Sequence, residues 1–184
     1  MRRAEFLALT GLTTDAFYSL ERRGRLPFKR PTQGVWADFS SIAALKTALA
    51  LALAEQGASQ EKAALFVSIA FNGALEQLLS VSRSDPFYFG FMTVGSEPYG
   101  DAAREFGQAR SMEAVAGSWR EIGQSMKRRA EQVRPSGEVV FGSVLIDATL
   151  VLKHFRARAK QAGLLKLVED EFAASLVQLR ELEE

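Results

Sequence analysis

Basic side chains that could bind an anionic polymer are concentrated near the start of the chain. Residues 1–35 contain seven Lys or Arg residues and three Asp or Glu residues, whereas the whole 184-residue chain has 23 of the former and 22 of the latter. The seven are Arg2, Arg3, Arg22, Arg23, Arg25, Lys29 and Arg30. Guanidinium and ammonium groups bind phosphates, and Arg can also donate two hydrogen bonds to guanine. The whole-chain net charge of +1 therefore hides a local excess of positive charge in residues 1–35.

The spacing of apolar residues predicts which of these side chains a helix would expose. Thr13 is typical of a helix N-cap, and Gly24 is typical of the residue that follows a helix. Phe17 and Leu20 fall on one helical face and should be buried. The exposed side chains would then be Thr14, Asp15, Tyr18, Ser19, Arg22 and Arg23, and all except the acidic Asp15 are candidate DNA contacts.

The neighbouring residues predict the elements that would position this helix. A short helix over 3–9 should precede it, with Gly11 in the turn. Two short strands within 28–36 should follow and carry the further candidates Lys29, Arg30 and Gln33. Periodic apolar residues then predict a long helix that ends at Gly57, and a second helix capped by Ser59.

Four segments in this order resemble the winged helix-turn-helix domain of the MerR family of bacterial transcription regulators. They are Leu-Thr-Gly-Leu-Thr (9–13), Leu-Glu-Arg-Arg-Gly-Arg-Leu (20–26), Gly-Val-Trp-Ala-Asp-Phe-Ser (34–40) and Leu-Ala-Glu-Gln-Gly-Ala-Ser-Gln-Glu-Lys-Ala (53–63). In that family these segments form the turn, the end of the recognition helix, the wing with its aromatic-Ser cap, and the junction before the fourth helix. The resemblance covers about a third of the chain.

The resemblance implies a DNA-binding transcription regulator that is bacterial and not an enzyme. Residues 1–72 would form the winged helix-turn-helix domain, with 14–23 in the major groove and the 28–36 wing against the backbone. Residues 73–184 would dimerise or sense an effector. A homodimer on double-stranded DNA is expected, because so small a reader contacts few base pairs and half-sites are usually paired.

Two departures from the family pattern motivate an alternative function. The family usually carries Arg-Tyr-Tyr before the Glu of its recognition helix, where this chain has Tyr18, Ser19 and Leu20. Its wing usually carries an Arg before the aromatic residue, where Ala37 and Asp38 stand here. A protein-interaction module that kept a winged-helix fold and lost DNA reading is the alternative hypothesis.

Residues 73–184 are expected to form a second region that is either α+β or mainly helical. A short helix is expected from Ala74 to about Ser82, and strands are expected over 87–94 and 138–146. The clearest helical period begins at Ser111 and ends before Pro135. Two further helices should cover 149–162 and 165–182. The expected fold class of the whole chain is therefore mainly α with some β.

An aromatic run is the most unusual composition in this second region. It comprises Phe87, Tyr88, Phe89 and Phe91, with Tyr99 nearby. A buried strand is the simplest interpretation. The alternatives are a pocket for an apolar small-molecule effector and an interface for a protein partner. A small enzyme would require several of the following acids to converge: Asp85, Glu97, Asp101, Glu138 and Asp147.

Composition excludes several kinds of chemistry. The chain has no Cys and one His, so thiol nucleophiles, disulfides and multi-His metal sites are not expected, and neither a catalytic set nor a cofactor motif is recognised. No stretch is long and apolar enough to span a membrane. We therefore expect a cytoplasmic protein without a membrane partner, associated with the nucleoid if it binds DNA.

Overall fold

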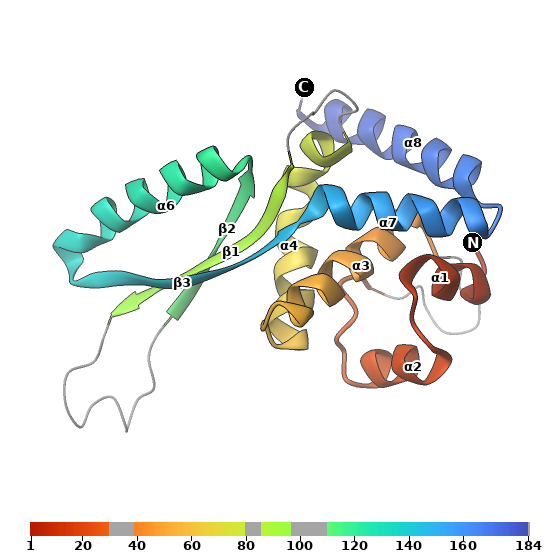
Figure 1. Ribbon diagram of the computed structural model, residues 1–184, viewed down its shortest axis with the longest axis horizontal. Helices are drawn as coiled ribbons and strands as arrows, with labels where there is room; N and C mark the ends of the chain where they lie inside the picture. The colour runs from red at the N-terminus through yellow and green to blue at the C-terminus, as the bar shows by residue number, and fades with distance from the viewer. Residues whose placement is uncertain (30–38, 80–85, 97–109, 184) are drawn as a thin grey trace.

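The computed structural model describes residues 1–29, 39–79, 86–96 and 110–183, which form a mainly helical α+β fold (Figure 1). The elements in chain order are α1 (Arg3–Thr10), α2 (Thr14–Arg22), α3 (Ser41–Glu55), α4 (Gln60–Leu79), β1 (Tyr88–Ser96), β2 (Arg110–Gly117), α6 (Trp119–Val133), η1 (Arg134–Ser136), β3 (Glu138–Asp147), α7 (Ala148–Gln161) and α8 (Leu165–Glu183). Among the helices described, none has the length and apolarity needed to cross a membrane.

The first two helices begin and end at residues suited to those positions. Gly11 follows α1 with φ of +75°, a left-handed conformation that glycine adopts without strain. The hydroxyl of Thr13 then accepts a hydrogen bond from the backbone N–H of Ala16 at 3.2 Å and caps α2. At the other end, the N–H of Arg25 donates to the carbonyl of Leu20 at 2.9 Å. The predicted succession of helix, turn and helix is confirmed.

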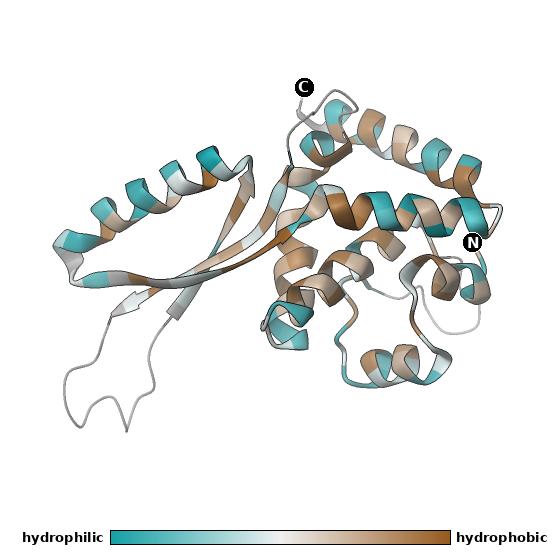
Figure 2. Cartoon of the chain, in the orientation of Figure 1, coloured by the Kyte–Doolittle hydropathy of each residue, from teal (hydrophilic) through white to brown (hydrophobic). Residues whose placement is uncertain are grey.

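The helix α3 lies at the centre of the helical part of the molecule. Its sequence is apolar on almost every side, as Figure 2 shows, and α1, α4, α7 and α8 all pack against it. Its first residue, Ser41, is fully buried, and the N–H of Ser41 donates to the carboxylate of Glu171 in α8 at 2.5 Å. Residues from both ends of the chain therefore share one hydrophobic core.

The helix α4 is longer than the sequence predicts. A helix after Ser59 and a separate short helix from Ala74 are expected, but α4 runs without a break from Gln60 to Leu79, so the expected end of the first unit at residue 72 lies within it. Gly73 lowers helix propensity by about 1 kcal/mol. Burial of Phe71 and Leu75 on either side of it outweighs that cost.

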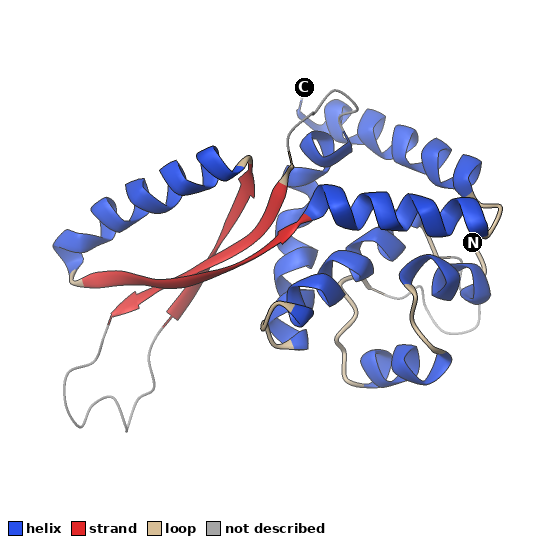
Figure 3. Cartoon of the chain, in the orientation of Figure 1, coloured by secondary structure: helices blue, strands red, loops and turns tan. Residues whose placement is uncertain are grey.

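A three-stranded antiparallel sheet extends away from the helices in the order β2-β1-β3 (Figure 3). The central strand β1 alternates its side chains between two hydrophobic cores. Phe89 and Phe91 face the helical core, where both rings lie close to that of Phe66, at 5.1 and 5.2 Å. Met92 and Val94 belong to a second core beneath α6. The predicted strands over 87–94 and 138–146 are confirmed.

The prediction of a helix from Ser111 is wrong for the first residues of that segment. Residues 110–117 form β2, and α6 begins only at Trp119, after Ser118 has capped it. Pairing with β1 decides this conformation, with Val115 in the second core and Glu113 forming an ion pair with Arg129 of α6. A three-residue spacing between apolar residues is compatible with a helix, but cross-strand pairing overrides it. The two C-terminal helices are confirmed as α7 and α8.

We predict that Gly90→Ala lowers the free energy of unfolding by about 3 kcal/mol or more, because a Cβ at this position would lie 2.0 Å from the carbonyl oxygen of Val144. The oxygen belongs to the backbone of β3, so it cannot move without disturbing the sheet. Chemical denaturation of both proteins measures the change. Gly142→Ala is the matched control in the same sheet, since a Cβ there meets nothing within 4 Å. Equal losses in the two variants would contradict the prediction.

Candidate nucleic-acid interface

The outer face of α2 carries a row of polar side chains one helical turn apart. Thr14, Tyr18 and Arg22 are exposed at positions i, i+4 and i+8, which lie along one side of a helix. Ser19 beside this row is partly exposed. Leu20 is buried on the opposite side and Phe17 is fully buried beside it, as the sequence predicts. The row therefore faces away from the core and is accessible to a large partner.

Four phenylalanines from separate segments hold α2 in place. The Phe17 ring of α2 lies 5.6 Å from that of Phe6 in α1 and 5.7 Å from that of Phe39, which precedes α3. Phe28, after α2, lies 5.8 Å from Phe6. These contacts are edge-on, a favourable arrangement of aromatic rings. The orientation of the exposed row is thus set by a rigid aromatic cluster.

Arg3 of α1 joins the exposed row through Tyr18. Its guanidinium Nη1 donates a hydrogen bond to the Tyr18 hydroxyl, and its Cζ lies 5.1 Å from the centre of the Tyr18 ring. The sequence counts Arg3 among the basic residues but does not connect it with Tyr18. Helical periodicity relates residues of one helix, so a contact between α1 and α2 has no such signal.

The other basic candidates differ in their surroundings. Arg23 follows α2 and is exposed, and Lys29 is also exposed. Arg25 is partly buried and donates to the side-chain oxygen of Gln60 at 3.2 Å, so it serves the contact between α2 and α4. Arg30 and Gln33 lie outside the described residues, as does most of the strand pair expected over 28–36.

One acidic side chain interrupts the positive surface. Asp15, Tyr18 and Arg22 line an open hollow of about 380 Å³ on the outer side of α2. A carboxylate here repels phosphate, although it can accept a hydrogen bond from a cytosine amino group. The face therefore combines donors and one acceptor and is not uniformly basic.

The aromatic run of the sheet is mostly structural. Phe87, Phe89 and Phe91 are each less than 5% exposed and belong to the helical core. Tyr88 faces the other way and packs edge-on against Trp119 at 5.5 Å. Tyr99 lies outside the described residues. The simplest sequence interpretation, a buried strand, agrees with these positions.

The acids considered for catalysis do not converge where the structure describes them. Glu138 and Asp147 occupy opposite ends of β3, roughly 30 Å apart for a ten-residue strand. Asp147 also caps α7, accepting a hydrogen bond from the N–H of Leu150 at 3.0 Å. Asp85, Glu97 and Asp101 lie outside the described residues, and no cluster of three possible metal ligands occurs within them. The outer face of α2 is therefore the site with the clearest geometry.

The comparisons with known proteins do not assign a role to this site. A scan against models of protein families finds no match, and a search of curated proteins finds no similar sequence. The arrangement of donors on α2 and their supporting contacts must therefore carry the functional argument.

We predict that Arg3 and Tyr18 stabilise each other by about 0.5–1 kcal/mol, as expected for an exposed cation–π pair. A double-mutant cycle with Arg3→Ala and Tyr18→Leu measures this coupling from the free energies of unfolding. Substitution by Leu removes both the hydroxyl and the ring. Arg2→Ala combined with Tyr18→Leu is the control, since Arg2 is an exposed arginine that precedes α1. Additive effects of Arg3→Ala and Tyr18→Leu would contradict the coupling.

Proposed function

We propose that this protein is a transcription regulator that binds double-stranded DNA with α2 as its recognition helix. The observation that carries the proposal is the exposed row of Thr14, Tyr18 and Arg22 on a helix whose opposite face is fixed in the core. A recognition helix needs exposed donors on a rigid support that lets it enter the major groove. The second helix of a helix-turn-helix pair has this position.

The proposed roles follow from side-chain chemistry. Arg22 can donate two parallel hydrogen bonds to guanine, and Asp15 can accept one from cytosine. Ser19 and Arg23 can bind phosphate oxygens beside the groove. Tyr18 is oriented by Arg3, which places a second cation next to the row. Base contacts would supply sequence selectivity, and phosphate contacts would fix the position of the helix.

Two further parts of the proposal rest on the family resemblance. Residues 28–36 would form a wing that contacts the DNA backbone through Lys29 and Arg30, and Lys29 is exposed at its start. The protein would act as a homodimer on paired half-sites, because one nine-residue helix reads few base pairs.

We predict that Arg22→Ala weakens binding to the preferred DNA by about 1–3 kcal/mol, or roughly 5- to 150-fold, and relaxes selectivity at one base pair. The preferred sequence is first selected from a random pool of duplexes. Fluorescence anisotropy then gives the affinity of each variant at several salt concentrations.

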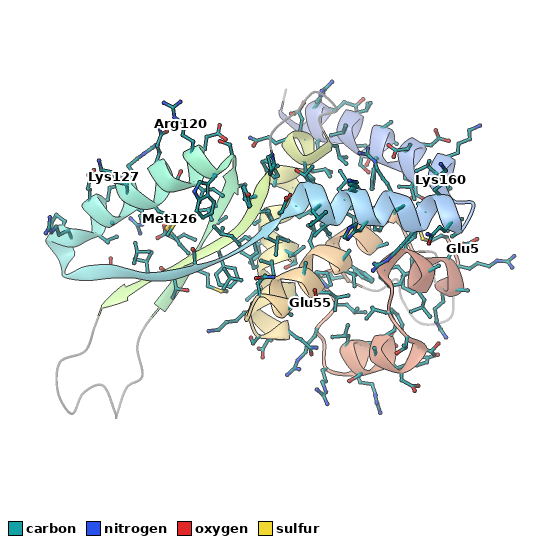
Figure 4. The ribbon with its side chains drawn as sticks, in the orientation of Figure 1. Glu5, Glu55, Arg120, Met126, Lys127 and Lys160 are labelled. Atoms are coloured by element: carbon teal, nitrogen blue, oxygen red, sulfur yellow. The ribbon has the colours of Figure 1, made fainter. Side chains whose placement is uncertain are left out.

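Variants that each remove one positive charge separate the roles of base contacts and phosphate contacts. Lys29→Ala should weaken binding to all sequences similarly and reduce the slope of log K against log salt by about 1. Arg120→Ala is the control, because Arg120 lies on α6, far from α2 (Figure 4). Failure of the selection to enrich any duplex at low salt would contradict the proposal.

One observation favours the alternative of a protein-interaction module. Leu65 and Ile69 of α4 are 52% and 74% exposed, one turn apart on the same helix. Adjacent exposed apolar residues can form the centre of a surface that binds another protein. If no duplex is bound, Ile69→Asp should abolish binding of a protein partner without affecting folding.

A further inference from the structure

A hollow with mixed charge lies beside the turn that joins α1 and α2. It has a volume of about 310 Å³ and is formed by the end of α1, the second half of α3 and the outer side of α7. His154 and Arg158 line it from α7, one helical turn apart, and Glu55 lines it from the end of α3. Its apolar lining residues include Leu51, Ala52 and Val151. Positive and negative groups thus come from different helices.

Arg158 connects this hollow to the turn. Its Nη1 donates to the backbone carbonyl of Thr10 at 3.0 Å and to that of Leu9 at 3.5 Å. Its guanidinium also lies against Gly11, where a Cβ would be 2.9 Å from Cζ. These contacts with α1 use only one of the three guanidinium nitrogens. Among the described residues, none accepts a hydrogen bond from Nε or Nη2, so these donors remain for another acceptor.

We propose that the hollow is a binding site for a small zwitterion of the α-amino acid class. Its carboxylate would accept hydrogen bonds from Arg158 and His154, and its ammonium group would donate to Glu55. An apolar side chain would lie on Leu51 and Val151. A guanidinium is well suited to a planar carboxylate, because it can donate two parallel hydrogen bonds to it.

The position of Glu55 selects this ligand class over a simple anion. Glu55 is the last residue of α3, so its carboxylate and the negative end of the helix dipole both favour a cation (Figure 4). A phosphate or a dicarboxylate would place negative charge near both. The volume lies at the lower end of the range for small-molecule sites, about 300–1,000 Å³, which also favours a small ligand.

Occupancy of the hollow would be coupled to the orientation of α2. A carboxylate bound to Nε and Nη2 of Arg158 would fix the guanidinium whose Nη1 donates to the carbonyls of Thr10 and Leu9, and these carbonyls adjoin the turn before α2. This coupling rests on the proposed function, whereas the binding site itself does not. Because linkage is reciprocal, DNA should change the ligand affinity by the same factor as the ligand changes the DNA affinity.

Binding is tested on the full chain without DNA. Each of the twenty amino acids at millimolar concentration is screened for a rise in Tm, and the strongest is titrated by calorimetry. We expect at least one with an apolar side chain to bind. Its decarboxylated amine and its deaminated acid should each bind at least about tenfold more weakly, because each lacks one charge-assisted contact. No rise in Tm with any amino acid would overturn the proposal.

Variants in the hollow locate the ligand. Glu55→Gln should weaken binding of the amino acid about tenfold and leave the deaminated acid unaffected, while His154→Leu, which removes a donor to the carboxylate, should weaken both. Ala52→Leu fills the hollow and should abolish binding. Glu61→Gln, at an exposed position in the first turn of α4, is the matched control. Equal effects of Glu55→Gln and Glu61→Gln would overturn the assignment.

A final measurement isolates the coupling. The DNA affinity is compared with and without the bound amino acid, and we expect a change of several-fold that is lost in Glu55→Gln. Binding by calorimetry with no change in DNA affinity would overturn the coupling and leave the site intact. Absence of DNA binding would contradict only the proposed function.

Discussion

Burial of α3 on nearly every side is the constraint on which the helical part of the molecule depends. A helix so apolar must be covered completely, and its neighbours come from both ends of the chain: α1 and α4 before the sheet, α7 and α8 after it. Glu171 of α8 accepts the backbone N–H at the start of α3, where a negative charge also suits the helix dipole. The first 79 residues therefore do not form a separate core, and the C-terminal helices complete the one on which α1 and α2 rest.

The same constraint explains why α2 is free to present its outer face. The helices packed on α3 bury their apolar sides against it, whereas α2 is attached through a cluster of aromatic rings around Phe17. Aromatic rings bury a large area for few residues, so Phe17 and Leu20 are the two buried residues of this nine-residue helix. This division leaves Thr14, Tyr18 and Arg22 exposed on the outer face of α2.

Sequence reasoning succeeded where a single local period or cap decided the structure. The boundaries of α2, the burial of Phe17 and the end of α3 before Gly57 all follow from such signals. It failed where a distant partner decided. Residues 110–117 form a strand because they pair with β1, and α4 continues through Gly73 because its neighbours are packed in the core. Neither interaction can be recognised from the few residues on either side. The candidate site divides in the same way: the exposed row on α2 was predicted, but the contact of Arg3 with Tyr18 was not.

The contact of Arg158 with the end of α1 gives the C-terminal part of the chain a direct connection to α2. Carbonyl groups at a helix C-terminus lack partners within the helix, and a guanidinium that supplies them fixes both the helix end and the turn that follows. Since Gly11 leaves room for that guanidinium, the turn and α7 fit each other closely. A change in the position of α7, whether from a ligand or from a second copy of the chain, would therefore act first on the turn that orients α2. In this fold, the orientation of α2 therefore depends on the element that caps its neighbour α1.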